Sequence, residues 1–356
     1  MTNVGKGNSS RGSVIVVVMV LVVLAAFLLS RFIERSLTEM LVESRARQSE
    51  RLRADAHSAL EATLAVLADY QAADNGLHAP AQGWGDPLAG ADFTPRPGTK
   101  VEVTVEDESA KLSLPRMEAP ALESLGVWLG LKETDASRFA DALLAWTHGD
   151  HTSAHFETDP RNYEREDPPH RVPGRPLESF NELAAITVAR DFFYTPEGQP
   201  TALRAQLARS VSLQDFPSTN LNTASTETLA LAGLDPAQAG KLADFNSGKT
   251  KPAPGAPPYF RSKAEAQAIV GATAPLAGLD TTAWCLRIRV TVHEGATAFQ
   301  LDAVVSPVSN TVRPPEDGQA TSSATAGAQP LTVADLKYPF TLLALEEKIA
   351  LPAPPS

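Results

Sequence analysis

The hydrophobic pattern at the start of the chain predicts one long helix. Residues 14–29 (VIVVVMVLVVLAAFLL) are all apolar, and Phe32 and Ile33 extend the run past a single arginine. The extended run reaches the roughly 20 residues that a membrane-spanning helix needs. Apolar residues then recur at spacings of three or four, as on one face of a helix: Leu52, Ala56, Leu60, Leu64 and Leu67.

Residues 13–70 contain neither proline nor glycine, which favours a single uninterrupted helix. An ordinary signal peptide would place a small-residue cleavage site after its apolar region, whereas the sequence RFIER follows here. We therefore predict that residues 13–33 cross a membrane and that the helix continues beyond it. The alternative is a signal anchor followed by a solvated, charged linker.

Alternation of apolar and polar residues predicts β-strands in two places. Val101, Val103 and Val105 alternate with polar residues, and the polar segment EDESAK then turns the chain toward a short strand at residues 112–114. Much later, apolar residues alternate again on both sides of the segment HEGAT, over residues 286–305. The pattern therefore predicts two β-hairpins.

Helical signals fill the region between the two hairpins. The simplest architecture is an α+β fold, with a long N-terminal helix packed on an antiparallel sheet and a large all-α domain inserted between the strands. The expected boundaries are 34–115 for the rest of the helix and the first strands, 116–283 for the inserted domain and 284–306 for the last strands. Residues 307–356 begin with a segment too rich in Pro, Ser, Thr and Ala to fold alone. They are predicted to be a low-complexity tail whose apolar end docks on or recruits something.

Composition restricts the possible functions. The chain has 356 residues, of which 43% are hydrophobic and 21% charged, so it is long enough to fold around a substantial core. Its net charge of -11 repels polyanions, which disfavours nucleic-acid binding. Its single cysteine, Cys285, excludes an intramolecular disulfide and a zinc site made of several cysteines.

One stretch has the form of a helix-hairpin-helix, a motif often found in DNA-binding proteins. It reads NLNTASTETLALAGLDPAQAGKLADFN, and its turn consists of Gly233, Leu234 and Asp235. In DNA-binding versions a second glycine lets backbone N–H groups approach a phosphate. Here Asp235 replaces that glycine and would repel the phosphate. We therefore expect this unit to serve packing or protein recognition.

A second stretch, WTHGDHTSAHFETDPRNYEREDPPH, concentrates carboxylates and imidazoles. Its ionisable candidates are His148, Asp150, His151, His155, Glu157, Asp159, Glu164, Glu166, Asp167 and His170. Three histidines and an aspartate could hold a catalytic zinc ion, but the chain has no HExxH, GxSxG or phosphate-binding glycine loop. Calcium suits such an oxygen-rich loop better, with Asp150, Glu157 and Asp159 as candidate ligands. A solvated acidic loop without metal is the remaining alternative.

Several of these segments occur in an order that resembles one family, the minor pseudopilin K of type II secretion. They are the short leader from Lys6 to Gly12 with the apolar helix after it, WGDPLAG with VEVTVEDESAKLSL, ALLAWTHGDHTSAHFETDPRNY, RPLESFNELAAI and NLNTASTETLALAGL. The resemblance covers about residues 5–306. It implies a pseudopilin-type sheet with a helix-hairpin-helix-like insertion.

The resemblance also implies how the N-terminus is processed. Residues 1–12 correspond to a prepilin-type leader that is cut after Gly12, leaving Ser13 as the first mature residue. Most pseudopilins carry glutamate at position five of the mature chain, whereas K-type subunits lack it, and Val17 stands there in this sequence. Two features depart from the family pattern: Ser13 replaces the usual Phe or Met, and His148 intrudes into the acidic calcium loop.

The function that the resemblance implies is structural, without catalysis. The protein is expected to cross the bacterial inner membrane once, with its N-terminus in the cytoplasm and its bulk in the periplasm, and to start or cap the pseudopilus that exports folded proteins. Expected partners are minor pseudopilins I and J, the major pseudopilin, the prepilin peptidase and the inner-membrane secretion platform, and no nucleic acid. The alternatives are a membrane-anchored DNA-binding protein of a competence-like uptake system and a periplasmic metallohydrolase.

Overall fold

The computed structural model describes residues 10–165, 169–307 and 339–350, with side chains from residue 15 to residue 349. The α-helices are α1 (Ser10–Asp74), α2 (Pro87–Gly90), α3 (Ala119–Trp128), α4 (Glu133–Thr147), α5 (Thr187–Phe193), α6 (Ala202–Ser210), α7 (Thr226–Leu231), α8 (Pro236–Asn246) and α9 (Lys263–Val270). The strands are β1 (Thr99–Asp107), β2 (Leu112–Ser113), β3 (Val211–Ser212), β4 (Thr219–Asn220), β5 (Leu279–Asp280), β6 (Leu286–Glu294), β7 (Thr297–Pro307) and β8 (Phe340–Ala350). Short 3-10 helices are η1 (Pro80–Gln82), η2 (Glu108–Ala110), η3 (Leu114–Arg116), η4 (Phe156–Thr158), η5 (Pro160–Arg165) and η6 (Phe180–Ala184).

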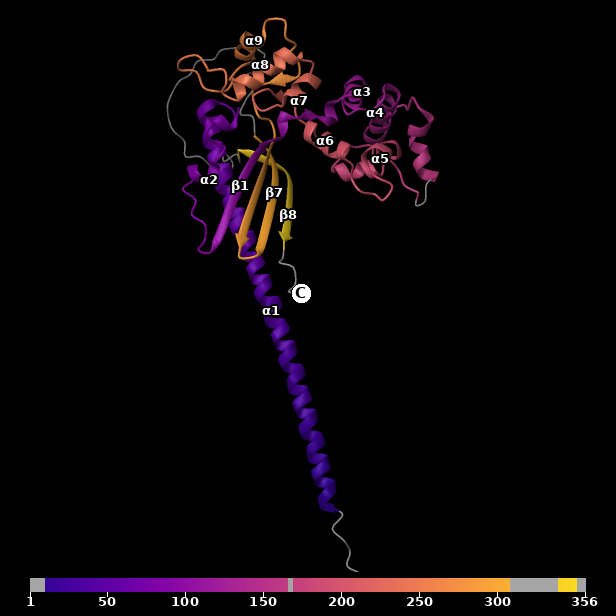
Figure 1. Ribbon diagram of the computed structural model, residues 1–356, viewed down its shortest axis with the longest axis vertical. Coiled ribbons are helices and arrows are strands. Elements are labelled where there is room, and N and C mark those ends of the chain that lie inside the picture. Colours follow the sequence, from indigo (N-terminus) through magenta and orange to yellow (C-terminus); the bar gives the residue numbers. More distant parts are fainter. Residues whose placement is uncertain (1–9, 166–168, 308–338, 351–356) are drawn as a thin grey trace, which may run out of the picture.

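Helix α1 is a continuous rod of 65 residues, about 98 Å long at 1.5 Å per residue. Its side chains from Ile15 to Ile33 are exposed, and within the described residues it is the one helix long and apolar enough to cross a membrane. Figure 1 shows this part of α1 extending well away from the rest of the fold. The predicted continuous helix is confirmed, and the alternative of a charged linker after residue 33 is wrong.

A four-stranded antiparallel sheet packs against the C-terminal half of α1, with strand order β1-β6-β7-β8. Strands β6 and β7 form the predicted second hairpin, with Leu286 opposite Val305 and Glu294 opposite Thr297. Alternate residues of this hairpin share one buried core with a stripe of α1. The core contains Leu52, Ala56, Leu60, Leu64 and Leu67 from α1, with Leu286, Ile288, Val290, Val292, Phe299, Leu301, Ala303 and Val305 from the hairpin.

The predicted first hairpin is wrong, although β1 is a strand. Strand β1 pairs with β6, from Thr99 opposite Glu294 to Asp107 opposite Leu286, and β2 pairs in parallel with β3. The cause lies in η2, where the backbone N–H groups of Glu108 and Ser109 donate to the Cys285 carbonyl, with N···O distances of 2.9 and 3.3 Å. These bonds hold the chain against the start of β6, so it leaves the sheet there and enters the inserted domain.

The prediction that residues 307–356 form a low-complexity tail is wrong for residues 340–350. These residues form β8, which pairs antiparallel with β7 and adds a fourth strand to the sheet. The pairing shifts between Val304 and Val305, so Leu343 is the extra residue of a β-bulge. The aromatic ring of Phe340 is buried in the core shared with α1. Residues 308–338 and 351–356 lie outside the described residues.

The domain between β1 and β6 is largely helical, and the α+β class with a long N-terminal helix is confirmed. It has two hydrophobic cores. One lies among α3–α6 and contains Phe139, Ile186 and Phe193, and the other lies among α7–α9 and contains Leu242 and Phe260. Figure 1 shows α7–α9 beyond the end of the sheet that is farthest from the apolar part of α1, with α3–α6 as a lobe beside them. Two-residue strands β3, β4 and β5 also occur in this domain, so it is not strictly all-α.

The packing of β8 predicts unequal effects of two substitutions in that strand. Phe340 is 3% exposed, so Phe340→Ala should lower the free energy of unfolding by about 3 kcal/mol, the usual cost of truncating a buried aromatic residue. Leu343 is 44% exposed at the bulge, and Leu343→Ala should cost less than about 1 kcal/mol. Denaturant unfolding of the two full-length variants measures both values. Equal costs would mean that β8 does not contribute to the core.

Candidate functional site

The helix-hairpin-helix predicted from the sequence is present. Ser225 caps α7, its Oγ accepting the backbone N–H of Thr228 at 3.1 Å. Gly233 has φ of 100°, a conformation that favours glycine, and it turns the chain between α7 and α8. Leu234 is buried in the core of this unit, and Asp235 is the N-cap of α8.

Asp235 occupies the position where a DNA-binding version would hold a phosphate. Its carboxylate accepts the backbone N–H of Gln238 at 2.8 Å, and the Gln238 side chain accepts the Asp235 N–H at 3.1 Å. This capping box uses donors at the start of α8 and adds a negative charge at the helix end that attracts anions. Lys249, beyond the C-terminal end of α8, is paired with Asp244 at an N···O distance of 3.0 Å. The helix start is therefore poorly suited to binding DNA.

The segment that opens this unit ties it to the sheet and to the segment that follows α1. The Asn220 Nδ2 group donates to the His78 carbonyl at 2.8 Å and to the Asp107 carboxylate at 2.7 Å. Asn222 donates to the carbonyls of Phe260 and Thr281, both at 2.9 Å, and accepts the Phe260 N–H at 2.8 Å. These bonds cross sequence separations of 38 to 142 residues, so they connect segments that are distant in the chain.

We call this set of contacts the joint, and Asp107, at the end of β1, is its buried centre. Burial raises the pKa of its carboxyl, while hydrogen bonds from Ser109, Thr223 and Asn220 act in the opposite direction. The Thr223 Oγ1 donates at 2.5 Å, and the Ser109 N–H at 2.9 Å. A second anchor joins the end of α1 to the same unit, where Arg261 and the Tyr259 hydroxyl both contact the Asp74 carboxylate. The helix-hairpin-helix is thus fixed to both layers of the α1–sheet core.

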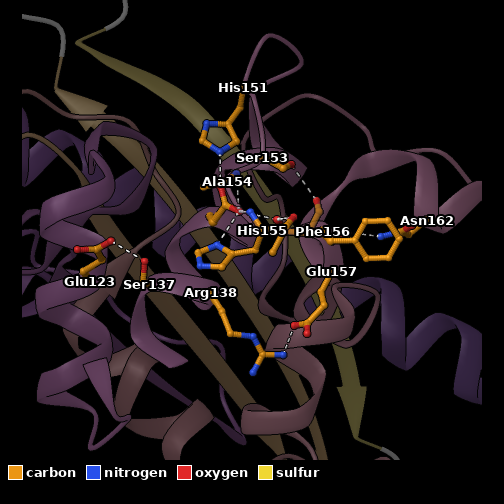
Figure 2. A network of polar contacts seen from close by, with 12 residues as sticks. Glu123, Ser137, Arg138, His151, Ser153, Ala154, His155, Phe156, Glu157 and Asn162 are labelled. Carbon is orange, nitrogen blue, oxygen red and sulfur yellow. Dashed lines mark hydrogen bonds and ion pairs between the residues drawn. The ribbon is translucent and has the colours of Figure 1, made fainter. Parts of the chain in front are cut away.

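The acidic loop that follows α4 is organised by a residue absent from the predicted set, Asp141. Figure 2 shows the loop side chains His151, His155 and Glu157, with Arg138 of α4 beside Glu157. Asp141 is 6% exposed and lies on α4 beneath the loop. Its carboxylate accepts the His151 Nε2–H at 2.7 Å, the Ala154 N–H at 3.0 Å and the His155 N–H at 3.0 Å. It also accepts the His155 Nδ1–H at 3.1 Å and the Thr158 hydroxyl at 2.5 Å.

The ionisation of Asp141 follows from these contacts. Burial disfavours its charged form, but the hydrogen bonds from Thr158, His151 and the two backbone N–H groups outweigh burial and lower the pKa of Asp141 well below its ordinary value of 3.8. The group is therefore an anion at every ordinary pH. An ionised carboxylate only accepts hydrogen bonds, so both histidines donate to it.

The predicted calcium ligands are not brought together. Glu157 pairs with Arg138 of α4, Asp159 pairs with Arg161 at 2.6 Å, and Asp150 is exposed in the turn before the loop. Arg161 lowers the pKa of Asp159 to about 2. Within the described residues, no group of three His, Cys, Asp or Glu side chains is placed to hold a metal ion. Glu166 and Asp167 lie outside those residues.

Asp141 and Asp107, the two buried carboxylates that we did not predict as site residues, each had a local signal in the sequence. Asp141 interrupts the apolar run FADALLAW of α4, and a carboxylate among Phe139, Ala142 and Leu143 indicates a buried acceptor that needs donors. Asp107 follows the alternating residues of β1 at a position where the strand enters the core. Neither signal identifies the donors. Those of Asp107 include Asn220 and Thr223, which are 113 and 116 residues away, and those of Asp141 come from an irregular loop 10 to 17 residues further along the chain.

The expected N-terminal processing site lies at the edge of the described residues. Gly12 and Ser13 are in the first turns of α1, where only the backbone is described, and residues 1–9 of the leader lie outside the description. Val17 is exposed on the apolar part of α1. The apolar part of α1 therefore presents an uncharged side chain at this position.

Comparison with known proteins identifies the fold. No protein-family model and no curated protein matches the chain. Among solved structures, the chain matches one in the crystal structure of the GspK-GspI-GspJ complex from the enterotoxigenic Escherichia coli type 2 secretion system, with a TM-score of 0.55 and 14% sequence identity. The match covers 87% of this chain and 99% of that chain. The chain therefore has a GspK-like fold.

The joint predicts that Asn222 is more important for stability than its small size suggests. Asn222→Ala should lower the free energy of unfolding by about 3 kcal/mol, because it removes three hydrogen bonds that are worth about 1 kcal/mol each. The matched control is Gln238→Ala, which removes one exposed capping bond and should cost about 1 kcal/mol or less. Denaturant unfolding of the full chain measures both. A loss for Asn222→Ala no larger than that of the control would contradict the role of the joint.

Proposed function

We propose that this chain is a minor pseudopilin of a type II secretion system and that it starts or caps the periplasmic pseudopilus. The observation that carries the proposal is the likeness of the whole architecture, which extends over 99% of the matched chain of a GspK-GspI-GspJ complex. The exposed apolar segment of α1, suited to a membrane, supports it independently. No part of the proposed function requires catalysis.

The shape of the molecule supports a place at the end of a filament. The inserted domain, residues 116–283, lies beyond the end of the sheet that is farthest from the apolar segment of α1 (Figure 1). In a stack of parallel helices, a domain of this size would collide with subunits placed above it. At the last position of the stack it projects without obstruction.

Val17 supports the same position on electrostatic grounds. In the family that the sequence resembles, glutamate at this mature position neutralises the amino terminus of a neighbouring subunit inside the membrane. A charge left uncompensated in hydrocarbon costs a few kcal/mol on insertion scales. Because Val17 supplies no negative charge, this chain is unsuited to positions where a neighbour depends on that charge. The first subunit of a filament has no such neighbour ahead of it.

The complex that contains the matched chain supports pseudopilins of the I and J types as proposed partners. The sequence resemblance adds the major pseudopilin, the inner-membrane secretion platform and a prepilin peptidase that removes residues 1–12. The protein would cross the inner membrane once, with its N-terminus in the cytoplasm and its bulk in the periplasm.

The two alternative functions have weaker support. DNA binding would have to overcome the net charge of -11 and the Asp235 carboxylate at the start of α8. A metallohydrolase would need a group of metal ligands, and His151 and His155, the most suitable candidates, instead donate to Asp141. The helix-hairpin-helix is better explained as the joint that attaches the inserted domain to the sheet.

Processing of the N-terminus tests the proposed class. Gly12→Leu should block cleavage, because the peptidase reads the residue before the cut, so the chain should keep residues 1–12. The control Gly7→Leu changes another leader glycine and should be cleaved normally, leaving Ser13 at the N-terminus. Intact mass and N-terminal sequencing of tagged full chains, purified from cells that express the prepilin peptidase, give the result. An identical mature N-terminus in both variants would contradict the proposal.

Co-purification with candidate partners tests partner choice. When the tagged wild-type chain is purified from detergent-solubilised membranes with co-expressed I-type and J-type pseudopilins, both should be recovered with it. Recovery of nucleic acid instead of these two chains would favour the DNA-binding alternative.

A further inference from the structure

The loop of residues 148–165 has little regular structure to hold its shape. Apart from η4 and η5, its backbone lies outside helices and strands, and the polar groups of such a segment need partners from elsewhere. The family resemblance implies calcium as that partner, supplied with oxygen ligands by the loop. The side chains of this chain are arranged differently.

The Asp141 carboxylate is already saturated with hydrogen-bond donors. Oδ1 accepts the His151 Nε2–H at 2.7 Å and the Ala154 N–H at 3.1 Å. Oδ2 accepts the N–H groups of Ala154 and His155, both at 3.0 Å, with the His155 ring at 3.1 Å and the Thr158 hydroxyl at 2.5 Å. A carboxylate offers about four lone-pair sites, so no acceptor capacity remains for a cation.

The loop also directs hydrogen-bond donors toward its centre, whereas a cation site would need oxygen ligands there. Calcium takes six to eight oxygen ligands at about 2.3–2.6 Å. Here the backbone N–H groups of residues 154 and 155 and two imidazoles converge on Asp141. The nearby loop carboxylates of Glu157 and Asp159 are paired with Arg138 and Arg161. A buried anion thus holds the place that a bound cation would take.

We propose that Asp141 replaces calcium as the organiser of residues 148–165, so that this loop keeps its conformation without any metal ion. Asp141 lies on α4, whose side chains Phe139 and Leu143 belong to the core of the α3–α6 lobe. The anchor is therefore part of the folded domain and does not depend on the calcium concentration around the protein. The inference concerns this chain's own fold and stands whether or not the proposed secretion role is correct.

One consequence is that the backbone on either side of an exposed aromatic residue, Phe156, is held in place. Phe156 is 80% exposed, and it lies directly after His155, whose N–H donates to Asp141. The Phe156 carbonyl accepts the Asn162 Nδ2–H at 2.7 Å (Figure 2). Without the Asp141 contacts, this part of the loop would be attached to α4 through the Glu157–Arg138 ion pair, and ion pairs between exposed groups contribute little.

The decisive experiment is hydrogen exchange on the wild-type full chain in detergent, with thermal unfolding, once in excess EGTA and once across a calcium titration. We expect the same protection of residues 148–165 and the same Tm in both conditions. A saturable rise in protection or in Tm with calcium would overturn the proposal.

Variants examined in EGTA test the role of the anion itself. Asp141→Asn should make the amides of the loop exchange about ten-fold to one-hundred-fold faster, because hydrogen bonds to a charged group are lost, while β6 and β7 keep their protection. The matched control Glu157→Gln removes a loop carboxylate that does not touch Asp141, and it should leave loop exchange unchanged. Equal exchange of the loop in Asp141→Asn and in the wild type would overturn the proposal. So would a slowing of exchange in the wild type by added terbium, a calcium substitute.

Discussion

The structure depends on the packing of one stripe of α1 against the inner face of β6 and β7. The sheet alone has a single buried face, and without Leu52, Leu60 and Leu67 that face would lie open to water. Each large side chain buried there contributes about 1.5–3 kcal/mol, so the folded domain cannot form independently of the helix. The same helix continues without a break into the apolar segment, so this core also sets the direction in which that segment leaves the sheet.

The inserted domain is attached by polar contacts, in contrast to that apolar core. Asp107, Asn220 and Asn222 connect the end of β1 with the first residues of the helix-hairpin-helix, and Asp74 at the end of α1 receives Tyr259 and Arg261. Such buried bonds add modest net stability but are costly to break, so they fix one geometry. A motif often used to hold a phosphate backbone serves here to position a domain at the end of a sheet.

The sequence was most informative where the pattern is local. The absence of glycine and proline over residues 13–70 predicted α1, and the alternation around HEGAT predicted the β6–β7 hairpin. The turn at Gly233 was also predicted correctly, because few residue types other than glycine adopt the positive φ that this turn requires. Alternation identified β1 as a strand but not its partner, which depends on the bonds between η2 and Cys285. Strand β8 was missed for the same reason, since its pairing with β7 joins segments that are distant in sequence. The Asp141 centre was missed although its donors lie 10 to 17 residues away, because an irregular loop has no periodic pattern that places its donors.

The distance between the exposed part of α1 and the sheet tests directly whether helix and domain form one rigid body. Nitroxide labels on Met40→Cys, in α1 at a position 68% exposed, and Lys348→Cys, in β8 with a side chain 61% exposed, report this distance by pulsed electron spin resonance. The native Cys285 is buried, and burial raises the pKa of its thiol, so it should react slowly with the label. The account predicts one narrow distance distribution, the same in detergent and in liposomes. A broad or two-peaked distribution would show a hinge between membrane helix and domain and would contradict it.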